Sequence, residues 1–99
     1  MISKHYTVDR KKREHIIEMI GAGEIIKKVI VDKGHEKGPE IHEISSTGII
    51  VIKNQRTKKL VTKLIARPGQ IRRYFKTDKA PEYLINIARE HEIKGYHLV

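Results

Sequence analysis

Two histidines flank a loop that is rich in glycine and proline. His35 lies in the GHEKGPE stretch of residues 34–40, and His42 lies in the IHEISS stretch that follows. Imidazole is the side chain most easily used as both acid and base near neutral pH. Loops often carry catalytic groups, which favours His35. His42 falls in a predicted strand, where neighbours point to opposite faces, so Glu43 should not assist it. Each histidine is a candidate acid or base, and an ordinary exposed polar residue is the alternative for each.

Cationic side chains gather at two predicted turns further along the chain. Guanidinium groups bind phosphate oxygens bidentately and can stabilise charge that develops in phosphoryl chemistry. RNA supplies its own nucleophile, the 2′-hydroxyl, so a ribonuclease needs only a base, an acid and cations around the phosphate. The cations are Arg56, Lys58 and Lys59 in the first turn and Arg67, Arg72 and Arg73 in the second, with Thr57, Gln70 and Tyr74 available for hydrogen bonds or base stacking.

Metal ligands are sparse in this sequence. It has no cysteine, no pair of histidines four residues apart and no acidic cluster of the kind that holds Mg²⁺. We therefore predict no metal and no other cofactor. Cleavage of DNA without a metal would be much harder to explain with these residues, because DNA lacks the 2′-hydroxyl.

The charge balance is the strongest global property. The 99 residues include 21 Lys and Arg against 12 Asp and Glu, which gives a net charge of +9. Such a domain tends to meet a polyanion, although a solvated lysine-rich surface is the alternative. We expect nucleic acid rather than a membrane, because no helix combines a large exposed apolar face with basic residues. The length predicts a single domain, and the absence of a spanning run or apolar leader favours the cytoplasm.

The order of predicted elements is helix, strands, helix. A helix is predicted from Thr7 or Asp9 to Ile20, after a loose lead-in at residues 1–6, and it ends at Gly21. Strands are predicted at 26–32, 41–46, 49–52, 60–66 and 70–75, a second helix at 80–92 capped by Thr77 or Asp78, and a short last strand at 96–99. Because the strands cluster, we predict an α+β fold with an N-terminal helix, a four- to five-stranded antiparallel meander and a C-terminal helix.

The strand at residues 60–66 predicts two different sheet faces. Alternation places Lys59, Lys63 and Arg67 on one side, and Leu60, Leu64 and Ala66 on the other with Thr62. One face is therefore predicted to be buried and the opposite face cationic. On the helices, His15 and His91 are predicted to lie on inner, packed faces.

Two stretches, GHEKGPEIHEI and TGIIVIKNQRTKKLVTKLIARPGQIRRYF, also resemble a known group of proteins. They are similar to small nuclease domains of bacteriophages and bacterial toxin systems, grouped with barnase-, EndoU-, colicin- and RelE-like ribonucleases. The similarity covers residues 31–75, and the segment ARPGQIRRY carries it most specifically. It implies an N-terminal helix before a four-stranded antiparallel sheet, RNA bound on the open sheet face, and metal-independent cleavage through a 2′,3′-cyclic phosphate.

The resemblance also implies roles for individual residues. His35 or His42 would act as acid or base, Arg67 and Arg73 would contact the phosphate, and Lys59, Thr57, Gln70 and Tyr74 would support them. From their charge, Arg56 and Lys63 join the expected substrate-binding residues. The C-terminal helix is a departure, because the core that the resemblance implies does not require it.

Three functions remain open from the sequence. The first is a metal-independent ribonuclease acting on RNA, with tRNA among the candidate substrates. The second is a nucleic-acid-binding module without catalysis, and the third is a structural or interaction protein of a phage or mobile element. A protein partner or inhibitor is compatible with each, and the sequence does not indicate an oligomeric state.

Overall fold

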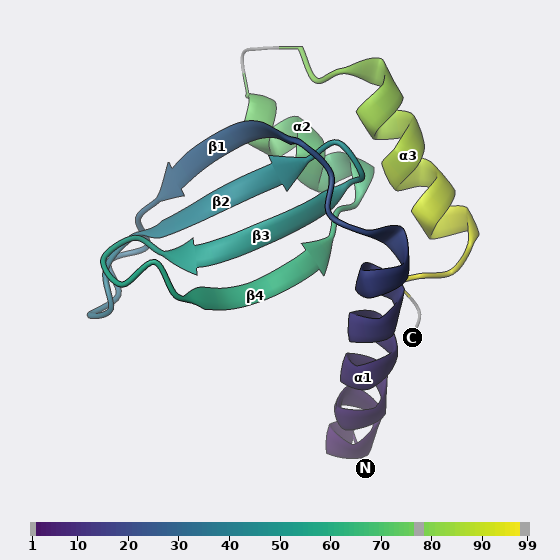
Figure 1. Cartoon of the computed structure of the whole chain (residues 1–99), viewed down its shortest axis with the longest axis horizontal. Coiled ribbons are helices and arrows are strands. Elements are labelled where there is room, and N and C mark those ends of the chain that lie inside the picture. The colour runs from purple at the N-terminus through teal and green to yellow at the C-terminus, as the bar shows by residue number, and fades with distance from the viewer. Residues whose placement is uncertain (1, 77–78, 98–99) are drawn as a thin grey trace.

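The computed structural model describes residues 2–76 and 79–97, and the side chains of residues 10–76 and 79–97. Four strands form one antiparallel sheet in the order β1-β2-β3-β4, so consecutive strands are neighbours. Figure 1 shows α2 lying behind one end of this sheet, α3 beside α2, and α1 projecting away from the strands. The elements are α1 (Ile2–Ile20), β1 (Ile25–Val31), β2 (Glu40–Ser45), β3 (Ile49–Asn54), β4 (Leu60–Ile65), α2 (Pro68–Phe75) and α3 (Glu82–Ile93). The α+β class with its antiparallel meander is confirmed.

The main core lies between one sheet face and the two C-terminal helices. Strand register aligns Ile44 of β2 with Ile50 of β3, and Ile50 with Leu64 of β4. Ile71 of α2 and Leu84 of α3 pack onto this row. Full burial of such an aliphatic side chain stabilises the fold by about 1.5–3 kcal/mol. Sheet and helices are therefore held together at the end of the strands where α2 begins.

The predicted strand at residues 70–75 is wrong, because this segment is the helix α2. Pro68 fixes φ near the helical value at the first helical position. The Gln70 side-chain oxygen accepts a hydrogen bond from the Arg67 backbone N–H at 2.9 Å, which closes the first turn. Ile71 and Phe75 are both buried, four residues apart on one helix face. Two apolar residues four apart share one face in a helix and also in a strand, so in so short a segment their spacing does not distinguish the two.

The other helices differ from prediction at their ends. α1 begins at Ile2, so the expected lead-in is helical, and α3 begins at Glu82 after Pro81. The proposed caps Thr77 and Asp78 lie outside the described residues, and residues 96–97 form a turn rather than a strand. His91 is buried as predicted, whereas His15 is exposed.

A second, smaller cluster joins α1 to the opposite sheet face. Ile17 packs with Ile49 and Ile65, and Ile16, Ile20 and Tyr96 lie against them. These contacts anchor the C-terminal part of α1 to the sheet. Within the part of the chain that the structure describes, no helix has both the length and the apolar character needed to cross a membrane.

Candidate functional site

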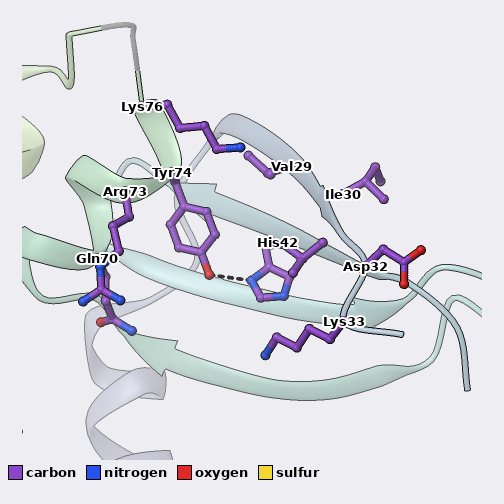
Figure 2. Close-up of a pocket in the computed structure, with 10 residues that line it drawn as sticks. Val29, Ile30, Asp32, Lys33, His42, Gln70, Arg73, Tyr74 and Lys76 are labelled. Atoms are coloured by element: carbon purple, nitrogen blue, oxygen red, sulfur yellow. Dashed lines mark hydrogen bonds between the residues drawn. The ribbon is translucent and has the colours of Figure 1, made fainter. Parts of the chain in front are cut away.

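A cavity of about 440 Å³, here called the His42 cavity, lies between the first strands and α2. Figure 2 shows Tyr74 and His42 next to each other, joined by a dashed line, with Gln70 and Arg73 on one side and Lys33 below. Its walls are residues 29–33 from β1 and the loop after it, His42 from β2, and Gln70, Arg73, Tyr74 and Lys76 from the α2 end of the molecule. Segments separated by some forty residues thus contribute to one concave site.

Strand alternation explains why His42 points into this cavity. His42 lies two residues before the core residue Ile44, so both side chains project from the sheet face that α2 covers. His42 pairs with Val29 of β1 and Ile52 of β3. On α2, Tyr74 follows the buried Ile71 by three residues, which places it on the helix face that looks onto the sheet.

His42 is held by a hydrogen bond at each ring nitrogen. Its Nε2 lies 3.1 Å from the Glu40 carboxylate, and its Nδ1 lies 2.5 Å from the Tyr74 hydroxyl. A carboxylate only accepts, so Nε2 carries the hydrogen, and in a neutral ring Nδ1 accepts from the Tyr74 O–H. The three groups form a chain from carboxylate to imidazole to phenol. His42 itself is 5% exposed, whereas Tyr74 is half-buried and forms the end of the chain that reaches the cavity.

Cations surround the phenol end of this chain. Of the residues that the structure describes, Lys33, Arg73 and Lys76 line the cavity together with one acid, Asp32. Burial raises the pKa of Tyr74, and the nearby Glu40 carboxylate raises it further, while the Arg73 guanidinium opposes both. The phenol is therefore uncharged near neutral pH and can donate a hydrogen bond. Together, a phenol that can donate a hydrogen bond and a cationic rim suit an anionic ligand.

Of the ten residues predicted for the site, the structure brings four into this cavity. They are His42, Arg73, Gln70 and Tyr74. His35 is exposed in the loop between β1 and β2 and does not line the cavity. Arg67 precedes α2, lines a neighbouring hollow with Gln70, and forms an ion pair with Glu92 at 3.6 Å.

The predicted residues of the first cationic turn belong to the far end of the sheet. Asn54 accepts hydrogen bonds from the backbone N–H groups of Arg56 and Thr57, and Thr57 accepts one from Lys59. Arg56 donates from Nη1 to the Glu36 carbonyl at 3.1 Å. This arginine therefore holds the loop that contains His35 rather than lining the His42 cavity.

Lys63 lies on the opposite sheet face, which is not simply cationic. Lys63 of β4 is paired with Val51 of β3, and Val51 is paired in turn with Glu43 of β2. Glu43 is 7% exposed and forms ion pairs with Lys53 at 3.1 Å and Lys28 at 3.7 Å. On the other face Leu64 packs against the core as predicted, but Leu60 is 55% exposed. The cavity is thus on the face that the helices partly cover.

Sequence reasoning missed several residues of the site, among them Glu40, Lys33 and Lys76. Glu40 lies two residues before His42, so strand alternation could have placed both on one face. Lys33 and Lys76 carry no local signal, because each reaches the cavity only through the packing of its loop or helix end.

Among the described residues, no group of three His, Cys, Asp or Glu side chains could hold a metal ion. Comparison of the chain with protein-family models, curated proteins and solved structures finds no match.

Proposed function

We propose that this protein is a metal-independent ribonuclease whose reaction takes place in the His42 cavity. The observation that supports this best is the Glu40–His42–Tyr74 chain ending in a cavity that Arg73, Lys33 and Lys76 also line. The cations would bind the phosphate of an RNA strand and place its ribose against Tyr74. The cavity volume of about 440 Å³ suits a single nucleotide.

The proposed reaction moves one proton along the chain as the phosphate is attacked. The 2′-hydroxyl gives its proton to the Tyr74 oxygen while the Tyr74 proton passes to His42 Nδ1. The 2′-oxygen bonds to phosphorus, and the bond to the 5′-oxygen breaks, which leaves a 2′,3′-cyclic phosphate. The leaving oxygen takes a proton from the ammonium group of Lys33 or Lys76. Glu40 stabilises the imidazolium that forms, and Arg73 stabilises the charge on the phosphate oxygens.

The test is cleavage of a labelled RNA, tRNA included, in the presence of EDTA, with the product ends identified. We expect cyclic phosphate ends, and no cleavage of the matching DNA. His42→Ala and Arg73→Ala should each reduce the rate by about a hundredfold or more. His35→Ala is the matched control, because His35 lies outside the cavity. Loss of activity in His35→Ala with retention in His42→Ala would overturn the assignment of the site, and inhibition by EDTA would overturn the metal-independent reaction.

A nucleic-acid-binding module without catalysis is the second candidate. The observation that favours it is that both ring nitrogens of His42 are already bonded within the protein. In this alternative the network has a structural role alone, which is to hold α2 on the sheet. This alternative predicts RNA binding that weakens with salt and RNA that remains intact afterwards. In either case we place the protein in the cytoplasm, where it would meet RNA, and where a protein inhibitor could cover the cavity.

A further inference from the structure

Three hollows share wall residues, from the His42 cavity beside β1 and α2 to the side of β4 that faces α1. Gln70 lines both the His42 cavity and a hollow of about 220 Å³, here called the junction hollow. Arg13 lines both the junction hollow and a third hollow of about 300 Å³ between α1 and β4, here called the β4 groove. Neighbouring hollows therefore adjoin each other at a shared wall residue, and the three together are here called the path.

Among the described residues, cations outnumber acids in the lining of each part of this path. Arg13 and Arg67 line the junction hollow, and Arg67 also forms an ion pair with Glu92 at 3.6 Å. Both partners of that pair are more than a third exposed, so solvent screens it and leaves Arg67 able to contact an anion. The β4 groove has three cations, Arg10, Arg13 and Lys63, against the two acids Glu14 and Glu18.

The start of α2 provides a row that connects the junction hollow to the His42 cavity. Arg67, Gln70 and Arg73 are three residues apart, so they are neighbours along one side of the helix. Each step of three residues advances roughly 4.5 Å along the helix axis. An arginine at each end with an amide between them gives successive phosphate and sugar contacts along this row.

His97, which lines the junction hollow, has a buried ring nitrogen without a hydrogen-bond partner among the described residues. His97 Nε2 is 2.8 Å from the Ile65 carbonyl, which can only accept, so Nε2 carries the hydrogen. Nδ1 is then an acceptor, and it is buried with no partner among the described residues. Because this atom is enclosed in the structure, a ligand would reach it only after the His97 ring moves, so a subsite in this hollow rests on Arg13 and Arg67 rather than on this nitrogen.

We propose that this path binds a single strand of RNA over several nucleotides, with the junction hollow as the subsite next to the reaction cavity. This inference rests on the proposed function in one respect, which is that the ligand is RNA. Volumes of about 220 to 440 Å³ match one nucleotide or part of one, and not the width of a duplex. The path also uses Arg10 and Arg13, which the reaction itself does not require.

The test is the affinity of the full chain for labelled 2′-O-methyl oligouridines, which cannot be cleaved, measured by fluorescence anisotropy. We expect an oligonucleotide of roughly twelve nucleotides to bind much more tightly than a dinucleotide. Arg13→Ala should weaken binding of the longer oligonucleotide about fivefold, as expected for an exposed charge contact, and leave the dinucleotide unaffected. The slope of affinity against salt should fall by roughly 0.7 for each phosphate group that the variant no longer binds.

Arg72→Ala is the matched control, because Arg72 lies on α2 beside Arg73 but faces a different hollow, against α3. It removes the same charge and should change neither the affinity nor the salt slope. Equal effects of Arg13→Ala and Arg72→Ala would show that binding depends on net charge alone, which would overturn the proposed path. Equal affinity for short and long oligonucleotides would also overturn it. Competition by polyglutamate as strong as by RNA would indicate an acidic protein partner instead. Because the probe cannot be cleaved, a protein that proves inactive on RNA can still pass or fail this test.

Discussion

The Tyr74→Phe substitution tests the hydrogen-bond chain most directly. It removes one oxygen atom, keeps the aromatic ring that packs on the core, and leaves His42 Nδ1 without its donor. His42 is 5% exposed, so an unpaired ring nitrogen should lower the free energy of unfolding by about 1–3 kcal/mol. If the phenol also carries the proton, the rate of RNA cleavage should fall by about a hundredfold or more.

Two assays separate these effects. Urea unfolding gives the stability change, and cleavage of a labelled RNA under conditions where the variant is fully folded gives the rate. Tyr83→Phe is the matched control, because Tyr83 is 49% exposed on α3 and its variant should stay within about 0.5 kcal/mol of wild type. A Tyr74→Phe protein with unchanged stability would refute the hydrogen bond. A destabilised variant with an unchanged rate would show that the phenol is structural only.

Other predictions concern charge, pH and backbone conformation. In Glu40→Gln, the amide oxygen can still accept from His42 Nε2 but the charge is lost, so the cleavage rate should fall by about tenfold or more with little change in stability, measured by the two assays above. Burial lowers the pKa of His91, so the unfolded state takes up a proton first as the pH falls. The contribution of His91 to the free energy of unfolding is fully present above the ordinary histidine pKa of about 6.5 and falls below it, by at most about 1.4 kcal/mol per pH unit. In urea unfolding, His91→Phe should flatten this dependence of stability on pH. Gly48 has φ +84°, and an added Cβ would lie 3.3 Å from His91 and Ile87. Gly48→Ala should therefore destabilise the fold by about 1–3 kcal/mol in thermal unfolding. Gly21→Ala is the comparison, because its added Cβ meets no neighbouring atom and its effect should come from the positive φ alone.

The site is only partly readable from the sequence. The chemistry of His42, Gln70, Arg73 and Tyr74 marks them as candidates, and they do line one cavity. The sequence analysis placed Gln70, Arg73 and Tyr74 on a predicted strand at residues 70–75, but this segment is the helix α2. A helix places Gln70, Arg73 and Tyr74 on neighbouring positions of one side, where a strand would have divided them between two faces.

The sequence by itself determined the α+β class, the four strand positions and the C-terminal helix. Those features depend on local properties, such as β-branched runs, breaker residues and periodic apolar spacing, which a short window of residues contains. Only the tertiary structure decided that Lys33 and Lys76 join His42, and that His35 does not. Such grouping depends on strand register and on how α2 is oriented across the sheet. Both are set by packing between segments far apart in the chain, so no local pattern of residues encodes them.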